Sequence, residues 1–154
     1  HDVHAVIAGA GYQRDELESL ASELGVADHV HLLGHREDVG VVHRALDLYV
    51  VTSDQEGMSS GMLEALAAGV PVVSTPVSGA AEVLTGGAAC GIVAPADALA
   101  TSIERLLFDR SRRAEMAVTT KAVIHGQYGT DRMVLAWERL LDHLSSTPSP
   151  EASI

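Results

Sequence analysis

Two glutamates, Glu56 and Glu64, flank a glycine- and serine-rich stretch, with seven residues between them. The stretch leads from an expected strand end into an expected helix start, where backbone N–H groups have no intrahelical acceptor. Such N–H groups suit a phosphate, and the helix dipole adds about 1 kcal/mol in its favour. Carboxylates accept hydrogen bonds from hydroxyls. The spacing therefore predicts a site for a ligand that carries both hydroxyls and phosphates, as a sugar nucleotide does.

The residues of this stretch have separate expected roles. Gly57 and Gly61 lack side chains, so a diphosphate can approach the backbone closely. Glu64 would lie about one turn into the helix, where its oxygens can accept from both hydroxyls of a ribose. Glu56, before the turn, can accept from hydroxyls of an attached sugar. The residues alone leave an alternative open, with Glu64 as an ordinary first-turn acid and Glu56 as an exposed loop residue.

The elements that must position these residues follow from the apolar pattern, which alternates between short runs and helical periods. Strands are expected at residues 3–8, 30–33, 48–51, 72–74 and 91–93. Helices are expected at residues 15–24, 38–45, 61–68, 81–84, 96–108, 112–125 and 131–144. Parallel strands are joined by crossovers that are usually helical, so this alternation predicts an α/β fold with a doubly wound, Rossmann-like parallel sheet. The domain is expected over residues 1–144. A disordered tail is expected at 145–154, which has no apolar period.

Bulk composition excludes several classes of function. The net charge is −11, with 10 basic against 21 acidic residues, so binding to nucleic acid or to an anionic membrane is not expected. Aromatic residues make up 3%, too few for a base-stacking surface. No apolar run approaches the roughly 20 residues that span a bilayer, and no secretory leader opens the chain. A single cysteine, Cys90, is expected to pack in the core. These features predict a cytoplasmic protein.

Ligands of doubly wound folds bind at the carboxyl ends of the strands, so two further loops matter. The loop after residues 30–33 contains His35 and Arg36. A ligand role for them and a local role, in which Asp38 caps the next helix, are equal alternatives. The loop at residues 9–11, Gly-Ala-Gly, begins like a dinucleotide fingerprint but has Arg14 where the third glycine belongs. A nicotinamide site is therefore not expected there, and the glycines are interpreted as a tight turn.

Residues 56–73, EGMSSGMLEALAAGVPVV, resemble the signature of the retaining glycosyltransferases of family 4, which have the GT-B fold. That signature is a glutamate, seven residues and a second glutamate, followed by a small-residue helix and Gly-x-Pro-Val-Val. Further segments agree in order and spacing, namely AVIAGAG, VHLLG, ALDLYV and GAAEV. The resemblance runs from about residue 3 to residue 144. It implies the C-terminal, donor-binding half of a GT-B fold that lacks its first strand.

The resemblance implies a hexosyltransferase that moves a sugar from a UDP- or GDP-sugar to an acceptor with retained configuration, without a metal ion or other cofactor. It implies Glu56 as the catalytic residue, beside the donor sugar, and Glu64 on the ribose hydroxyls. The diphosphate would meet backbone amides around residues 59–61, and the loop of His35 and Arg36 would border the base. The full expected substrate-binding set is Glu56, Gly57, Met58, Ser59, Ser60, Gly61, Glu64, His35 and Arg36.

Met58 and Ser59 stand where many members have Phe-Gly close after the first glutamate, which leaves the sugar open. The family neutralises the leaving diphosphate with an arginine and a lysine from a first strand-loop-helix unit, and binds the acceptor with an N-terminal domain. Both are expected to lie outside this chain, which would therefore bind a donor without transferring its sugar. Without the first strand, either an upstream segment fills the gap beside residues 3–8 or these pair directly with residues 48–51.

The last expected helix has an apolar face made of Met133, Leu135, Ala136, Trp137, Leu140 and Leu141. One alternative is that this face packs on its own domain, and the other is a homotypic contact that makes a homo-oligomer. Two other functions also remain open from the sequence. One is a nucleotide-sugar epimerase on the same architecture, and the other is a non-catalytic binding module that keeps the fold.

Overall fold

The computed structural model describes residues 2–85 and 90–146 of the 154-residue chain. The chain divides into two compact units, His1–Ala45 and Leu46–Ile154. Each unit has its own parallel sheet. The domain predicted over residues 1–144 spans both units and stays a prediction.

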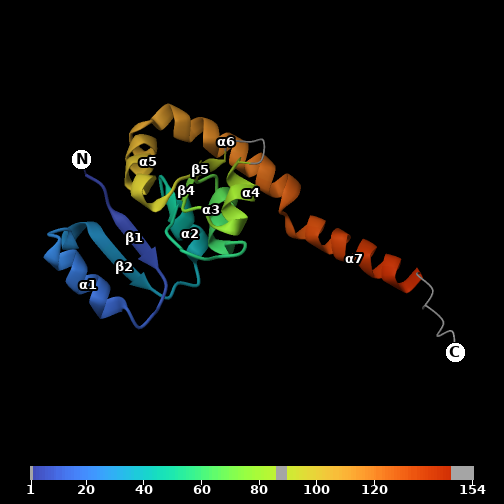
Figure 1. Ribbon diagram of the computed structural model, residues 1–154, viewed down its shortest axis with the longest axis horizontal. Coiled ribbons are helices and arrows are strands. Elements are labelled where there is room, and N and C mark those ends of the chain that lie inside the picture. The colour runs from blue at the N-terminus through green and yellow to red at the C-terminus, as the bar shows by residue number, and fades with distance from the viewer. Residues whose placement is uncertain (1, 86–89, 147–154) are drawn as a thin grey trace. The chain divides into compact units, whose positions relative to one another are not determined.

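The first unit contains a two-stranded sheet and three helical segments (Figure 1). Its elements are β1 (Ala5–Ala8), α1 (Arg14–Glu23), the 3-10 helix η1 (Ala27–His29), β2 (Val30–Gly34) and α2 (Val39–Arg44). The parallel register runs from Ala5 opposite Val30 to Ala8 opposite Gly34. Parallel strands are normally buried on both faces. All of β1 is exposed, so this two-stranded sheet has little core of its own.

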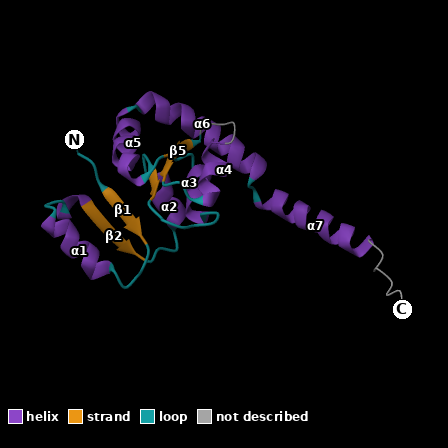
Figure 2. Ribbon diagram, in the orientation of Figure 1, coloured by secondary structure: helices purple, strands orange, loops and turns teal. Residues whose placement is uncertain are grey.

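The second unit contains a three-stranded sheet whose strands lie in the order β3-β4-β5. Its elements are β3 (Tyr49–Val51), α3 (Ser60–Ala67), β4 (Val72–Ser74), α4 (Ser78–Thr85), β5 (Gly91–Val93), α5 (Ala96–Phe108), α6 (Arg110–Gln127) and α7 (Thr130–Ser146). The three strands run parallel and start in register, with Tyr49 opposite Val72 and Val72 opposite Gly91. Their carboxyl ends therefore lie at one edge of the sheet. Helices surround these strands (Figure 2).

The core of the second unit lies on both faces of β4, whose three residues are all buried. Val72 and Val73 point to opposite faces because side chains alternate along a strand. Val72 belongs to one cluster, which consists of Val51, Met62, Leu66, Val72, Val77, Ala80, Val83, Leu84, Cys90 and Ile124. Val73 belongs to a second cluster, with Leu106 and Met116. Helices thus cover the sheet on both sides, as the doubly wound pattern predicts.

The motif Gly69-Val70-Pro71 ends α3 and starts the approach to β4. Gly69 has φ +85°, a left-handed conformation that favours glycine. Its N–H donates to the carbonyl oxygen of Leu66, and the N–H of Val70 donates to that of Ala65. This pair of bonds is the Schellman motif, which satisfies the last carbonyls of a helix. The carbonyl oxygen of Pro71 then accepts from the N–H of Tyr49, which begins the pairing of β3 with β4.

The strands and helices expected from the sequence are confirmed, with differences at their ends. Helix α3 starts at Ser60 and not at Gly61, and α4 starts at Ser78, three residues before the expected position. Helix α7 continues through Ser146, so the expectation that the tail begins at 145 is wrong. Residues 147–154, the rest of the predicted tail, lie outside the described part of the chain.

The five strands form two sheets, one in each unit, so the direct pairing of residues 3–8 with 48–51 stays a prediction. Every pair that forms is between strands consecutive in sequence, namely β1 with β2, β3 with β4, and β4 with β5. Short helical crossovers favour such pairs, since they bring sequential strands together locally.

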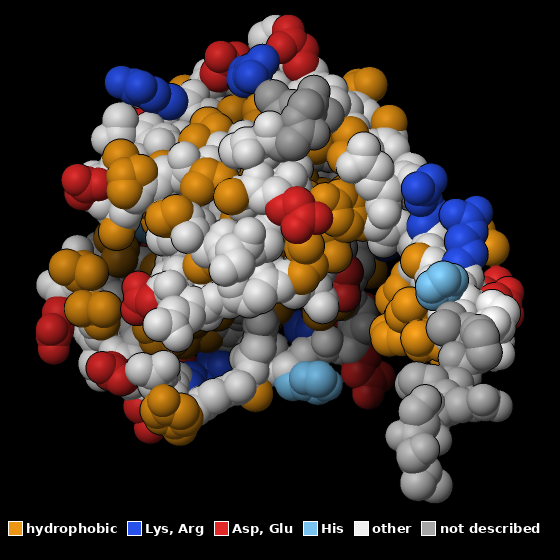
Figure 3. Space-filling view, turned by 45° about the vertical axis from the view of Figure 1, so that its right-hand side comes forward, with side chains coloured by type: hydrophobic (Ala, Val, Ile, Leu, Met, Phe, Trp, Pro, Cys, Tyr) orange, Lys and Arg blue, Asp and Glu red, His pale blue; other side chains and the backbone are white. Residues whose placement is uncertain are grey.

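Helix α7 has no buried residue, so the packing on its own domain that was one alternative is not seen. Its apolar side chains gather in a patch on the surface (Figure 3). Among the described residues, no helix combines the length and the apolar character needed to cross a membrane.

Candidate functional site

The loop between β3 and α3, residues 52–59, brings Glu56 and the start of α3 to the carboxyl edge of the second unit's sheet. Ser59 is the N-cap of α3, and its Oγ accepts from the N–H of Met62 at 3.4 Å. The first N–H groups of a helix have no intrahelical acceptor. Within the described part of the chain, the Ser59 side chain takes that of Met62, and the N–H groups of Ser60 and Gly61 are left to meet an anion.

Glu56 is half-buried and is held to the sheet by two successive hydrogen bonds. Ser53 Oγ donates to Glu56 Oε2 at 3.1 Å. Thr75 Oγ1, directly after β4, donates to the carbonyl oxygen of Ser53 at 2.6 Å. The N–H of Thr75 also donates to the carbonyl oxygen of Val51. The ends of two neighbouring strands therefore fix the loop that presents the Glu56 carboxylate.

An open pocket of about 500 Å³ lies beside Glu56. Two loops form it, one after β3 and one after β4, and its lining residues are Asp54, Gln55, Glu56, Gly57, Pro76, Val77 and Ser78. This is the position at which parallel α/β sheets bind ligands. The lining has two carboxylates and no lysine or arginine. The carboxylates can accept hydrogen bonds from hydroxyl groups. A phosphate would be bound here by backbone N–H groups and not by cationic side chains.

Gly79 holds the two loops around the pocket in contact. Its N–H donates to the carbonyl oxygen of Gly57 at 3.1 Å. A Cβ at position 79 would lie 2.5 Å from that oxygen and 2.9 Å from the Cα of Met58. Only a glycine allows α4 to approach the Glu56 loop so closely, since both obstructing atoms belong to the backbone.

Tyr49 connects the two glutamates of the site. Burial raises the pKa of the Tyr49 phenol, and the negative charges of Glu56 and Glu64 raise it further. A Cβ at Gly61 would lie 2.5 Å from the Tyr49 hydroxyl oxygen. The phenol therefore lies beneath the first turn of α3, within the electrostatic reach of both carboxylates. Glu64 itself is exposed on α3.

Of the predicted site residues, Glu56 and Gly57 line the pocket, whereas residues 58–61 and Glu64 follow them into α3 and are not part of its lining. The structure also adds residues that the sequence did not suggest. Tyr49 and Ser53 were missed, as was the whole loop from Thr75 to Ser78. One signal could have found that loop. The rule that carboxyl ends of adjacent parallel strands meet applies to the segment after residues 72–74 as well as to the segment after 48–51. No pattern in the sequence singles out Tyr49.

The other predicted site residues, His35 and Arg36, belong to the first unit and are exposed after β2. The Arg36 guanidinium donates to both carboxylate oxygens of Asp38, each at 2.7 Å. This contact lowers the pKa of the Asp38 carboxyl. Asp38 occupies the N-cap position of α2, but its side chain makes no capping bond. The expectation that Asp38 caps this helix is therefore wrong, because Arg36 competes for the same oxygens.

The glycine loop of the first unit also borders a pocket, of about 330 Å³. Its lining comes from the loop, from α1 and from the two strands, and consists of Ile7, Gly9, Ala10, Gly11, Tyr12, Gln13, Arg14, Leu17, Leu32 and Gly34. The N–H of Gly9 donates to the carbonyl oxygen of Gly34 at 2.8 Å, which ties the loop to the end of β2. The sequence predicted a tight turn here and did not predict the pocket.

Cys90 is fully buried in the larger core cluster of the second unit. Burial raises the pKa of its thiol, so the reactive thiolate is disfavoured. The expected packing role is confirmed.

The chain resembles known proteins over most of its length. Residues 1–123 match the family described as glycosyl transferases group 1. The lipopolysaccharide core biosynthesis glycosyltransferase LpsE of Rhizobium meliloti is 32% identical over 141 residues, which are 90% of this chain and 42% of that protein. A GDP-mannose-dependent phosphatidylinositol monomannoside mannosyltransferase of Mycolicibacterium smegmatis is 34% identical over 128 residues, or 76% of this chain and 34% of that protein.

Solved structures give the same result. Alr3699/HepE of Anabaena, in complex with UDP, superposes with a TM-score of 0.80 and 28% identity, covering 94% of this chain and 41% of that one. WaaG, a glycosyltransferase of lipopolysaccharide biosynthesis, superposes with a TM-score of 0.74 and 29% identity. The structural neighbours are GT-B glycosyltransferases, and this chain spans less than half the length of each relative named. By its fold and by the match over residues 1–123, the chain belongs to the group 1 glycosyl transferases.

Proposed function

We propose that this chain is the donor-binding, C-terminal part of a retaining GT-B glycosyltransferase of family 4, and that its donor is a UDP- or GDP-sugar. The observation that carries the proposal is the pocket beside Glu56, at the carboxyl edge of a parallel sheet. Its carboxylates can accept from sugar hydroxyls, and the N–H groups at the start of α3 can meet a diphosphate. Relatives support the class of donor, since one is described as GDP-mannose-dependent and another was solved with UDP-glucose.

In this proposal Glu56 is the catalytic residue and contacts the donor sugar. Glu64 accepts from the ribose hydroxyls, and the backbone of residues 57–61 approaches the diphosphate. His35 and Arg36 are proposed to border the base. The donor is a substrate, and no metal ion or other cofactor is required. The protein is proposed to act in the cytoplasm.

Transfer to an acceptor is proposed for the whole protein and not for the 154-residue chain alone. The chain covers 42% of LpsE. Its pocket has no cationic side chain to stabilise the leaving diphosphate, which is commonly a large part of catalysis. We propose that the acceptor domain and these charges come from the remaining part of the protein.

Calorimetric titration of the chain with UDP, GDP and UDP-glucose tests the donor site. We expect one nucleotide class to bind saturably. Glu64→Gln should weaken it about tenfold or more, because a hydrogen bond to a charged group contributes about 1.5–3 kcal/mol. The matched control is Glu104→Gln, which removes an exposed carboxylate from α5 and should leave affinity unchanged. Equal effects of the two variants, or no binding at millimolar nucleotide, would contradict the proposal.

NMR analysis of the sugar separates the transferase from the alternatives. The whole protein with donor and acceptor should give a glycoside with the anomeric configuration of the donor. Conversion of the donor into its epimer would indicate an epimerase instead, and binding without any reaction would indicate a non-catalytic module.

A further inference from the structure

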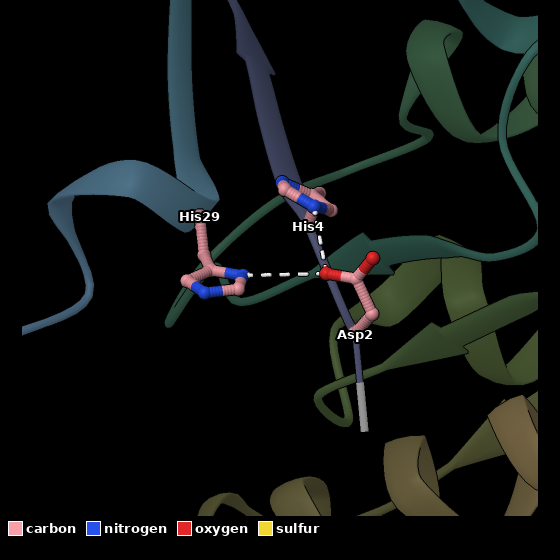
Figure 4. A group of neighbouring side chains, drawn as sticks. All are labelled: Asp2, His4 and His29. Atoms are coloured by element: carbon pink, nitrogen blue, oxygen red, sulfur yellow. Dashed lines mark hydrogen bonds and ion pairs between the residues drawn. The ribbon is translucent and has the colours of Figure 1, made fainter.

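Three side chains at one end of the first unit, Asp2, His4 and His29, converge on one point (Figure 4). His4 directly precedes β1, and His29 directly precedes β2. Because Ala5 lies opposite Val30 in the parallel register, the residues before each strand are neighbours as well. The sheet therefore holds two imidazoles side by side, and Asp2 reaches back to them.

The donor atoms of this cluster have separations that a bound ion would need. Asp2 Oδ1 lies 3.0 Å from His4 Nε2 and 3.9 Å from His29 Nδ1. One ligand atom from each of the three residues lies within 4.8 Å of the others. Ligands about 2.0–2.1 Å from a tetrahedral Zn²⁺ ion are roughly 3.3 Å apart. Small rotations of these exposed side chains would close the set around an ion.

The Nδ1 atom of each imidazole has a further contact. His4 Nδ1 lies 2.9 Å from His31 Nε2, and His29 Nδ1 lies 3.1 Å from the carbonyl oxygen of Val3. For His4 this contact leaves Nε2, which lies 3.0 Å from Asp2 Oδ1, to an ion. For His29 it involves Nδ1, the same atom that lies 3.9 Å from Asp2 Oδ1, so an ion would replace the contact with Val3 there. Metal-binding histidines usually donate their second N–H to a neighbouring acceptor, as Nδ1 of His4 can to His31, which sets the tautomer and orients the ring.

The ring of His4 is further positioned by its neighbours. Its centroid lies 4.8 Å from that of His29 and 5.1 Å from that of His31, so two imidazoles flank the ring of His4. The side chains of Asp2, His4 and His29 are 84%, 44% and 46% exposed, and an ion can reach them without any opening of the fold. The net charge of −11 also attracts cations.

We propose that Asp2, His4 and His29 form a binding site for a divalent transition metal ion of the Zn²⁺ class. Two neutral imidazoles and a carboxylate suit Zn²⁺ or Ni²⁺ and are a poor set for Mg²⁺ or Ca²⁺, which prefer oxygen ligands. The ion replaces the direct contact between Asp2 and His4, and it is coordinated by Nε2 of His4 and by Nδ1 of His29, which gives up its contact with Val3. His31 accepts from Nδ1 of His4 in the bound state. The site lies within the first unit and does not depend on the proposed donor site.

Titration of the tag-free 154-residue chain with ZnCl₂ and, separately, MgCl₂ tests this site by calorimetry. We expect one Zn²⁺ ion per chain and no saturable Mg²⁺ binding. His4→Gln and His29→Gln should each weaken Zn²⁺ binding by about tenfold or more. His31→Leu should weaken it by about tenfold, because loss of a residue that orients a ligand usually costs about 10- to 100-fold in metal affinity. His125→Gln, an exposed histidine on α6, is the matched control and should bind as the parent does. Long-range ¹H–¹⁵N NMR spectra should show Zn²⁺ on Nε2 of His4 and on Nδ1 of His29.

Two results would overturn the proposal. One is Zn²⁺ binding that is absent or is weakened equally by His125→Gln and His29→Gln. The other is binding that His1→Gln abolishes and His29→Gln does not, because the ion would then sit on a different chelate. Circular dichroism spectra of all variants exclude loss of folding as the cause.

Discussion

The negative charges of both glutamates of the candidate site act on the phenol of Tyr49. Burial and the charges of Glu56 and Glu64 all disfavour its phenolate, so its pKa lies above the ordinary value near 10. A folded pKa above the unfolded one means that the native state binds the proton more tightly. The contribution of Tyr49 to the free energy of unfolding is therefore fully present below about pH 10 and is lost as the pH rises through the folded pKa.

The ionisation of this phenol can be followed by its absorbance. The titration curve of the Tyr49→Phe variant is subtracted from that of the parent chain, which leaves the contribution of Tyr49. We expect it to ionise above pH 10, and we expect Glu56→Gln or Glu64→Gln to move the transition to lower pH by removing a negative charge. Glu104→Gln, distant in sequence and on α5, should not move it. Ionisation at or below the ordinary value would show that the phenol does not lie between the carboxylates.

At the scale of elements, the approach of α4 to the Glu56 loop decides the shape of the pocket. Gly79→Ala would place a methyl group against the backbone of Gly57 and Met58, which cannot move aside as a flexible side chain can. We expect a loss of about 1–3 kcal/mol in the free energy of unfolding, as for other overpacked positions. Donor affinity should fall as well, because the displaced loop carries Glu56. Urea denaturation and calorimetric titration measure the two effects.

Gly126→Ala in α6 is the matched control for this substitution. A Cβ at Gly126 would meet nothing within 4 Å, and alanine favours helix by about 1 kcal/mol over glycine. The control variant should be as stable as the parent or more so, with unchanged donor affinity. If Gly79→Ala behaves in the same way, the contact between α4 and the loop is not what positions Glu56.

At the scale of the whole molecule, helix α7 leaves an apolar stripe exposed. Six apolar residues fall within about 120° of the helix circumference at 100° per residue. They are Met133, Val134, Trp137, Leu140, Leu141 and Leu144, and their exposed fractions run from 46% to 61%. A contiguous apolar surface of this kind commonly marks an interface. In the whole protein, other parts of its length are available to cover the stripe. In the isolated chain, a second copy can cover it.

Sedimentation equilibrium of the 154-residue chain should therefore show self-association that increases with concentration. The double variant Leu140→Gln and Leu141→Gln should weaken it, because it removes apolar area from the centre of the stripe. Arg139→Gln, off the stripe on the same helix, is the control and should associate as the parent does. A monomer at every concentration would contradict this prediction.

The sequence alone predicted those parts of the site that depend on the order of neighbouring residues along the chain. Glu56 and Glu64 were identified because a strand end, a glycine turn and a helix start follow one another within a few residues, and each has a recognisable composition. The end of α3 at Gly69 was similarly readable, because only a left-handed residue closes a helix in this way. Such features have their physical cause within one or two turns of chain.

The tertiary structure alone decided which distant residues meet. Tyr49 lies near both glutamates because β3 passes under α3, and Thr75 holds the Glu56 loop because β4 pairs with β3 in register. His4 and His29 are separated by most of the first unit, and only the parallel register of β1 and β2 makes them neighbours. Composition and periodicity determined the strands, the helices and the pair of glutamates. Strand pairing and packing depend on contacts between residues far apart in sequence. The tertiary structure therefore determined which residues surround the two glutamates.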